Sequence, residues 1–441
     1  MKNKALTISV WLVVALTMFS LMAALIVFIM VSNTYSTQLE NIYKRSFYEL
    51  SSNINDLEVD MSKLVAVNDK ATKREVLTNI YNSCTMANSN ISNLPISNNK
   101  IEKVNKFINT LGGYAYSLLE KVNENEEFSE YDYESIESLH EASLNLMAEY
   151  NAYISTIKFD YKIINDVDYS NEDDSNFSAG IVSSTASQVP TLIYDGPFSD
   201  SVLNKEIKGL NAMEITKEEA ERVVVDKLGY LGISNVKFEG ESDGEFYTYN
   251  FSVDCGGVGM YVQVTKQGGT IVDVTGYGVG GNKNLDNNKA ILLAEDFAKQ
   301  LGYEGVKQVW YAENNNIIYI NLAPIINGVI YYPDLVKVKV DKTMGVVVAL
   351  EGKNYCYNHV LRSLPVPQIT FNNAQNNLSK ALTVIERNYA LIPNKFVGET
   401  LTYEFVCTWK DYTYYVYVDV ETGKEVNVLR VIKTTTGDLI I

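Results

Sequence analysis

The sequence predicts an α+β protein with three parts: an N-terminal transmembrane helix, an all-α helical bundle, and three small domains that each pack one helix on an antiparallel sheet. Three observations predict this order. An uncharged apolar run opens the chain, helix-spaced apolar residues follow it, and alternating β-branched and aromatic residues fill the C-terminal half. The apolar pattern therefore changes once from the helical period of 3.6 to the strand period of 2.

The apolar run covers residues 5–31, which carry no charge and directly follow Lys2 and Lys4. A helix of this length spans about 40 Å, more than the ~30 Å hydrocarbon core of a bilayer. A secretory signal peptide has a shorter apolar stretch and a small-x-small cleavage site, which residues 28–30 do not offer. We expect residues 1–34 to be a retained single-pass anchor rather than a cleaved signal. The lysines favour a cytoplasmic N-terminus, with the bulk of the chain extracytoplasmic.

Residues 35–164 are predicted to form an extracytoplasmic helical domain of about four helices. Apolar residues recur three and four positions apart, which places them on one face of each helix. The first stripe continues from the anchor, so one long helix is expected to leave the membrane. Gly112 and Gly113 are expected to kink or break the third helix. The stripes begin Leu39, Tyr43, Phe47, Leu50, Ile54; Leu77, Ile80 or Tyr81, Cys84; Ile101, Val104, Leu111; and Ile136, Leu139, Leu146.

A linker is predicted over residues 165–209. Its first part, residues 165–178, is rich in acids, Asn and Ser and holds no base, which marks the main domain boundary. The later segment PTLIYDGPFSD has two interpretations. One is a strand that docks on the next domain and ends in a turn. The other is a contact with a partner protein or the preceding helical domain, and the two interpretations are compatible. The candidate partner-binding or structural residues are Pro190, Leu192, Ile193, Tyr194, Asp195, Gly196, Pro197 and Phe198.

Three similar segments follow, at residues 210–281, 282–363 and 364–441. Each begins with an apolar residue, then a polar stretch, then an alanine that opens an amphipathic helix. Each ends with a strand, a turn with glycine five residues after a valine, and a last strand. Their period suits three α+β domains better than a solenoid. The matching positions are Ile215/Ala220, Leu285/Ala290 and Ile369/Ala374, then Val264/Gly269, Val340/Gly345 and Val418/Gly423.

Helix caps and strands can be assigned within these repeats. Thr216, Asp286 and Asn372 are the expected N-caps, and Glu219 completes a capping box with Thr216. Strands are expected at residues 246–253, 260–264, 317–322, 329–340, 401–409 and 412–420, because β-branched and aromatic residues alternate there. Turn signals such as Asn327-Gly328 separate them.

The helix ITKEEAERVVVDKLG, the strands after it and the glycine turn resemble the PepSY domain, three times over about 70 residues each. The third copy departs most, because FNNAQNN replaces the charged helix start. With the anchor, the helical region and the PTLIYDGPFSD segment, the whole chain resembles the YpeB family of spore germination proteins. This resemblance implies residence at the inner membrane of the spore. It also implies mutual dependence with a SleB-type cortex-lytic enzyme, which degrades spore peptidoglycan.

Side chains that carry catalysis are scarce. The chain has two histidines, His140 and His359, and Leu144 stands where a zincin motif needs its second histidine. No GxSxG is present. The four cysteines are far apart without a CxxC, and buried free thiols are the preferred interpretation over disulfide pairing. The glycine-rich residues 276–281 lack the lysine of a nucleotide loop and are interpreted as a flexible inter-repeat linker. We therefore expect no catalytic, cofactor or metal site.

The net charge of −17 argues against nucleic acid as a partner. The leading hypothesis is a non-catalytic membrane-anchored protein that binds and stabilises or restrains the SleB-type enzyme. Alternatives are a sensor subunit of a membrane complex, a general PepSY-type peptidase inhibitor and, least favoured, a peptidoglycan hydrolase. A protease that cuts the exposed polar linker is a further candidate partner.

Overall fold

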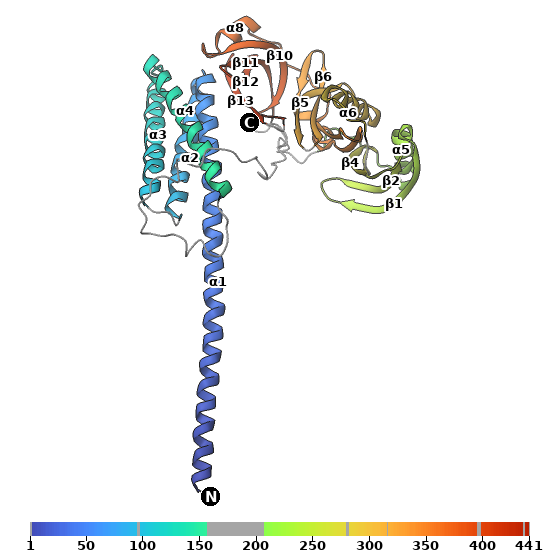
Figure 1. Ribbon diagram of the computed structural model, residues 1–441. Helices are drawn as coiled ribbons and strands as arrows, with labels where there is room; N and C mark the ends of the chain where they lie inside the picture. The colour runs from blue at the N-terminus through green and yellow to red at the C-terminus, as the bar shows by residue number, and fades with distance from the viewer. Residues whose placement is uncertain are drawn as a thin grey trace. The chain divides into compact units, whose positions relative to one another are not determined.

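The computed structural model describes residues 2–94, 98–156, 207–278, 282–314, 316–394, 398–434 and 437–440 (Figure 1). The chain divides into a helical unit, Met1–Val65 with Lys73–Ser187, and a sheet unit, Ala66–Thr72 with Gln188–Ile441. Helices followed by a sheet-rich region confirm the predicted α+β class. The domain boundary predicted at residues 165–178 lies outside the described residues.

The first helix, α1 (Lys2–Ala66), is continuous over 65 residues. Its first part exposes large apolar side chains: Trp11 is 68 %, Phe19 74 % and Phe28 70 % exposed. Farther along, the predicted stripe Phe47, Leu50, Ile54, Leu57, Met61 and Leu64 is buried. In the helical unit, α1 continues well beyond α2–α4 (Figure 1). It contains a stretch long and apolar enough to cross a membrane. The prediction that one long helix continues from the apolar run into the bundle is confirmed.

The described part of the helical unit contains three further helices: α2 (Lys70–Ser92), α3 (Asn98–Glu124) and α4 (Glu130–Thr156). Most residues of the predicted stripes are buried, including Leu77, Ile80, Cys84, Leu111 and Ile136. Helix α4 begins with a reciprocal cap, in which the Ser129 amide donates to Asp132 Oδ2 and the Asp132 amide to Ser129 Oγ. Lys121 of α3 contacts the same carboxylate at 2.7 Å. This carboxylate thus starts one helix and ties it to its neighbour.

Polar contacts also cross the interior of the bundle. His140 on α4 lies 2.8 Å from Glu58 on α1, and both side chains are almost fully buried. The Tyr150 hydroxyl donates to the carbonyl of Phe47. Because an unpaired polar group in this interior would cost several kcal/mol, these contacts fix the register of α1 against α4.

Helix α3 passes through Gly112 and Gly113 without a break. The two glycines differ in surroundings, because a Cβ on Gly112 would lie 3.1 Å from the Cβ of Cys84 on α2, whereas one on Gly113 meets nothing within 4 Å. Gly112 therefore permits close approach of two helices, and Gly113 only weakens its own helix.

This difference predicts opposite effects of two neighbouring substitutions. Gly113→Ala should stabilise the helical unit by about 0.5–1 kcal/mol, because alanine loses less backbone entropy in a helix. Gly112→Ala should stabilise the helical unit less than Gly113→Ala does, or destabilise it, because the Cys84 side chain must shift to make room for the new methyl group. Hydrogen–deuterium exchange of α2 and α3 in the full-length chain in nanodiscs would measure both. Equal stabilisation by the two variants would contradict the contact.

The sheet unit contains fourteen strands that form one sheet among the described residues. Four helices accompany them: α5 (Lys217–Leu228), α6 (Asn287–Leu301), α7 (Lys353–Asn358) and α8 (Phe371–Asn376). Strands of the first repeat are β1 (Ile233–Asp243), β2 (Tyr247–Cys255), β3 (Val258–Thr265) and β4 (Ile271–Gly278). Those of the second are β5 (Val306–Asn314), β6 (Ile317–Ile326), β7 (Val329–Tyr331), β8 (Val336–Asp341) and β9 (Val346–Glu351). Those of the third are β10 (Thr383–Pro393), β11 (Glu399–Trp409), β12 (Tyr412–Asp419), β13 (Glu425–Thr434) and β14 (Gly437–Ile440).

The two sequence signatures of the repeats meet in space. In each repeat the amide of the opening apolar residue donates to the carbonyl two residues after the signature valine: Ile215 to Lys266, Leu285 to Lys342 and Ile369 to Val420. The turn glycines Gly269, Gly345 and Gly423 have φ of 66°, 66° and 71°, which glycine adopts without strain. The start of each helix is thus tied to the turn between the last two strands.

Three details differ from the sequence prediction. The run 329–340 is two strands separated by the 3₁₀ turn Tyr332–Asp334, because Pro333 cannot donate to a ladder. Thr370, not Asn372, caps the helix of the third repeat, and that helix has only six residues. Gly276 and Gly278 lie in β4, so this part of the glycine run is strand rather than linker. Thr216 with Glu219, and Asp286, cap their helices as predicted.

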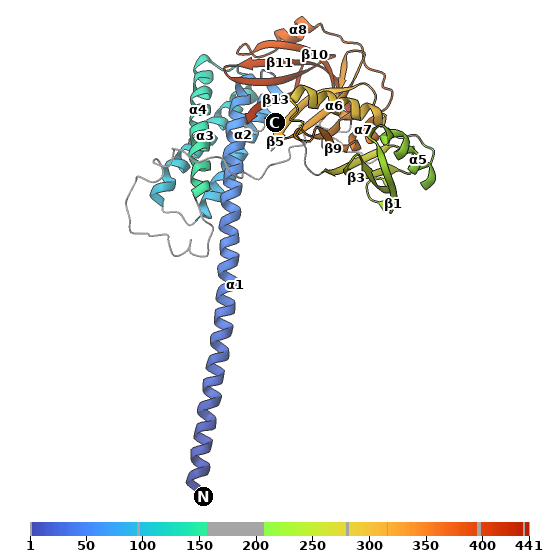
Figure 2. The ribbon, with the colours of Figure 1, turned by 45° about the vertical axis from the view of Figure 1, so that its right-hand side comes forward.

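The first and second repeats share one sheet and one core. Strand β4 pairs with β9, in the register Asp273↔Glu351, Val274↔Leu350 and Thr275↔Ala349. One apolar cluster runs through both repeats and includes Ala220 and Val224 of α5 together with Ala294 and Phe297 of α6. Helix α5 packs on β1–β3, and α6 on the strands of its own repeat (Figure 2). The two repeats therefore form one packed body.

The second and third repeats close a barrel. Short strand β7 pairs with β6 and, in parallel, with β10, and β14 pairs with β5. The ring runs β5-β6-β7-β10-β11-β12-β13-β14 and back to β5. Its apolar cluster takes residues from both repeats, including Trp310, Tyr332, Ile392, Tyr417 and Leu429.

A carboxylate lies inside this barrel. Glu404 is 1 % exposed, accepts a hydrogen bond of 2.6 Å from the Tyr332 hydroxyl and another from Asn388 Nδ2. Trp310 stacks on Tyr332 with 4.8 Å between ring centroids. Burial raises the pKa of Glu404, since an apolar interior disfavours the charged form.

The raised pKa predicts how barrel stability depends on pH. Between the unfolded-state pKa of Glu404 and its higher folded-state value, the folded state binds more protons than the unfolded state. The free energy of unfolding should therefore fall as pH rises through this window, by at most about 1.4 kcal/mol per pH unit. Hydrogen exchange of β10 and β11 would show this dependence. Glu404→Gln should remove it, whereas Gln at the exposed Glu421 should not.

Candidate binding site

The site residues expected from the sequence, Pro190–Phe198 of the PTLIYDGPFSD segment, lie outside the described residues. Their assignment stays a prediction. The described chain begins again at Ile207, and its amides at Lys208 and Gly209 donate to the carbonyls of Tyr357 and Cys356. Residues 208 and 209 are thus hydrogen-bonded to α7.

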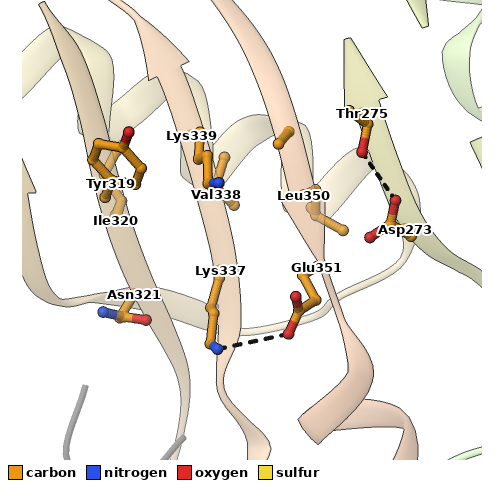
Figure 3. A pocket seen from close by; sticks show the side chains of 11 residues that line it. Asp273, Thr275, Tyr319, Ile320, Asn321, Lys337, Val338, Lys339, Leu350 and Glu351 are labelled. Atoms are coloured by element: carbon orange, nitrogen blue, oxygen red, sulfur yellow. Dashed lines mark hydrogen bonds and ion pairs between the residues drawn. The ribbon is translucent and has the colours of Figure 1, made fainter. Parts of the chain in front are cut away.

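A hollow of about 220 Å³ lies on the sheet at the joint between the first and second repeats. Two rows of side chains cross β4, β9, β8 and β6 and line it (Figure 3). The first row is Asp273, Glu351, Lys337 and Asn321, and the second is Thr275, Ala349, Lys339 and Tyr319.

Strand alternation explains why this face is polar. Successive residues of a strand point to opposite faces, and the neighbours Val274, Val338 and Leu350 lie in the core on the α6 side. The lining side chains therefore occupy the face opposite the helices. Ala349 has the smallest side chain of the two rows, and the hollow lies over it between longer neighbours.

The charges in the hollow are divided between its two sides. Asp273 and Glu351, both acidic, stand directly opposite each other on β4 and β9. Lys337 Nζ lies 3.6 Å from Glu351, and the Thr275 hydroxyl donates to Asp273 (Figure 3). Burial raises the pKa of Asp273, and the negative charge of Glu351 raises it further. The hydrogen bond from Thr275 lowers this pKa but does not outweigh burial.

Lys339 occupies the other side. Its Nζ lies 5.3 Å from the ring centroid of Tyr319, a cation–π contact. Among the described residues, neither Lys339 nor Asp273 forms an ion pair. The hollow thus presents a carboxylate on β4 and an ammonium group on β8 with a small residue between them.

The side chains that usually carry catalysis have other surroundings. His359 Nδ1 lies 2.8 Å from Asp334, and Arg362 binds the same carboxylate and that of Glu399. All four cysteines are buried and free. Burial raises the pKa of Cys84, Cys356 and Cys407 to about 12 and that of Cys255 to about 11. These thiols are protonated at neutral pH and poor nucleophiles.

The described residues contain no group of three or more His, Cys, Asp or Glu side chains suited to a metal ion. The charged and hydrogen-bonding side chains that line the hollow can bind charged groups on the polar face of the sheet.

Sequence reasoning missed the hollow. The sequence feature that points to this polar face is the alternation of polar and apolar residues in each strand, such as Lys337 and Lys339 between buried valines. The pattern shows which residues share a face. It does not show that β4 pairs with β9, which are separated by more than 60 residues along the chain.

Two family models match the chain. One, described as "YpeB N-terminal", matches residues 31–158, and the other, "YpeB sporulation, PepSY1 and PepSY2 domains", matches residues 175–365. Together they cover most of the chain. The third predicted repeat lies almost wholly beyond the second model.

Relatives named "Sporulation protein YpeB" match most of the chain. The protein from Halalkalibacterium halodurans is 25 % identical over 408 residues, 89 % of this chain and 90 % of its own. That from Bacillus subtilis is 23 % identical over 403 residues, 88 % of this chain and 89 % of its own. The solved Bacillus megaterium YpeB C-terminal domain covers 49 % of this chain and 98 % of its own, with 26 % identity and a TM-score of 0.44. The chain belongs to the YpeB family of sporulation proteins, which carry PepSY domains.

Proposed function

We propose that this protein is a non-catalytic, membrane-anchored germination protein that holds a SleB-type cortex-lytic enzyme in a stable or restrained state until spore peptidoglycan is hydrolysed. The N-terminus lies in the cytoplasm, and the remainder lies outside the inner membrane of the spore. The sheet unit makes the contact with the enzyme.

The observation that carries this proposal is the continuity of α1. Its first part exposes Trp11, Phe19 and Phe28, and its later part supplies Leu50 and Leu57 to the bundle core. Large apolar side chains on an isolated helix are stable in lipid and not in water. A chain with this helix is tethered, and the bundle is held close to the membrane surface. Lys2 and Lys4 favour the cytoplasmic side for the N-terminus.

A binding role is supported by the way the sheet unit is built. The repeats share strand pairings and apolar clusters, so the outer face of the sheet is preorganised. Preorganised surfaces lose little conformational entropy on binding. The polar hollow at the joint between repeats gives this face charged and hydrogen-bonding groups.

A non-catalytic role is supported by the surroundings of the histidine and cysteine side chains. His140 is enclosed with Glu58, and His359 is held by Asp334. A general base must reach a substrate proton, and the His140 side chain is only 2 % exposed. The cysteines are buried thiols with raised pKa.

The test is accumulation of the cortex-lytic enzyme in spores. Deleting residues 210–441 should abolish accumulation, because the enzyme loses its binding partner. A matched control, Lys289→Gln at an exposed position of α6, should leave the amount unchanged. In parallel, the purified full-length chain should release no muropeptides from cortex fragments. Unchanged enzyme in the deletion strain, or muropeptide release by the chain alone, would overturn the proposal.

A further inference from the structure

We propose that the hollow at the joint of the first two repeats binds a small zwitterion, a molecule with a primary ammonium group and a carboxylate group joined by a short aliphatic chain. Asp273 would receive the ammonium group and Lys339 the carboxylate, over the small side chain of Ala349. The test of this site uses the small molecule alone, so its outcome does not depend on the partner enzyme proposed above.

The register of the strands sets the spacing of the two charges. Asp273 on β4 and Lys339 on β8 are separated by β9, and they lie in adjacent rows of the same face. Strands are ~4.8 Å apart and residues of one face follow at ~6.7 Å, so the two Cα atoms lie about 12 Å apart. Both side chains border the hollow. One extended molecule can contact both ends, which a compact ion cannot.

The charges of the hollow favour such a ligand on both sides. Two carboxylates directly opposite each other in neighbouring strands repel, and Asp273 and Glu351 form such a pair at the acidic side. Lys337 approaches Glu351, and the Thr275 hydroxyl donates to Asp273. The positive charges of Lys353 and Lys339 also act on Asp273, but neither forms an ion pair with it among the described residues. A ligand ammonium group would complete the neutralisation of this side. A ligand carboxylate would neutralise the positive charge of Lys339.

The size of the hollow selects a small occupant. Its volume of about 220 Å³ is below the roughly 300–1,000 Å³ of pockets for drug-sized ligands. Tyr319 and the stems of Lys337 and Lys339 supply apolar walls for an aliphatic chain. An amino-acid-sized molecule fits, whereas a folded partner domain does not.

The probe is 6-aminohexanoate, titrated into the full-length chain in nanodiscs and followed by calorimetry and saturation-transfer NMR. We expect a dissociation constant of about 0.1–1 mM, typical of a few contacts with one small molecule. Hexylamine and hexanoate carry one charge each and should bind at least tenfold more weakly. Glycine should also bind weakly, because its two charges are too close together to reach both sides.

Three variants locate the binding. Asp273→Asn and Lys339→Gln should each weaken binding tenfold or more, and Ala349→Leu should abolish it by filling the hollow. Lys289→Gln, on the opposite face, should bind as the unchanged chain does. Circular dichroism would verify that each variant is folded. Absence of binding at about 20 mM probe, where a millimolar site would be saturated, would overturn the proposal. So would equal affinity for hexylamine or hexanoate, or unchanged affinity in either charge variant.

Discussion

Replacing Gly352 by alanine is expected to open the joint between the first and second repeats. A Cβ at this position would lie 1.8 Å from the hydroxyl oxygen of Tyr303 and 2.4 Å from its ring. Tyr303 is 1 % exposed, and its hydroxyl donates to the carbonyl of Ile271 in β4. The ring cannot move without breaking this bond, and the Gly352 amide itself donates to Val272.

The expected cost combines overpacking with the loss of a buried hydrogen bond, about 3–5 kcal/mol together. Hydrogen–deuterium exchange of β4 and β9 in the full-length chain should rise at least about 100-fold, since each 1.4 kcal/mol changes an equilibrium tenfold. Gly244→Ala is the matched control, because a Cβ there meets nothing within 4 Å. Unchanged protection of β4 and β9 in the Gly352 variant would show that the two repeats are not locked in this way.

Replacing Arg362 by methionine is expected to loosen the third repeat from the second. The Arg362 guanidinium binds Asp334 of the second repeat at 2.7 Å and Glu399 of the third at 2.6 Å. Asp334 is fully buried. Burial lowers the pKa of Arg362, but the hydrogen bonds to Glu399 and Asp334 outweigh this and raise it overall.

Removing one partner of a buried ion pair leaves an uncompensated charge, which costs about 3–5 kcal/mol. Exchange of β7 and β10, which pair across the two repeats, should therefore increase strongly. Adding Asp334→Asn to the Arg362 variant should recover part of the loss, because it removes the stranded charge. Arg222→Met is the control, since that exposed pair with Glu219 is worth little. A loss as large in the control as in the Arg362 variant would contradict this account.

Local patterns in the sequence predict the helices and the repeat signatures. Apolar spacing is a property of each helix alone, so the stripes through Leu50, Leu77 and Ile136 could be assigned correctly. The glycine turns at Gly269, Gly345 and Gly423 could also be assigned, because a positive φ requires a particular residue type.

The joints between repeats depend on distant pairings and could not be predicted this way. Nothing in the sequence of β4 indicates that β9 will lie beside it, nor in β14 that β5 will. The hollow could not be predicted for the same reason, since its lining comes from four strands of two repeats.

The shortness of helix α8 can be explained from its sequence, because its asparagines are poor helix formers.

Direct binding between purified components tests the central claim, that this protein acts by holding another protein at a membrane. The full-length chain in nanodiscs would be mixed with the SleB-type enzyme and examined by size-exclusion chromatography and calorimetry. We expect a saturable complex with the whole chain, and none with the chain that lacks residues 210–441. Separate elution of the two proteins at micromolar concentrations of both, with no heat of binding, would contradict the account.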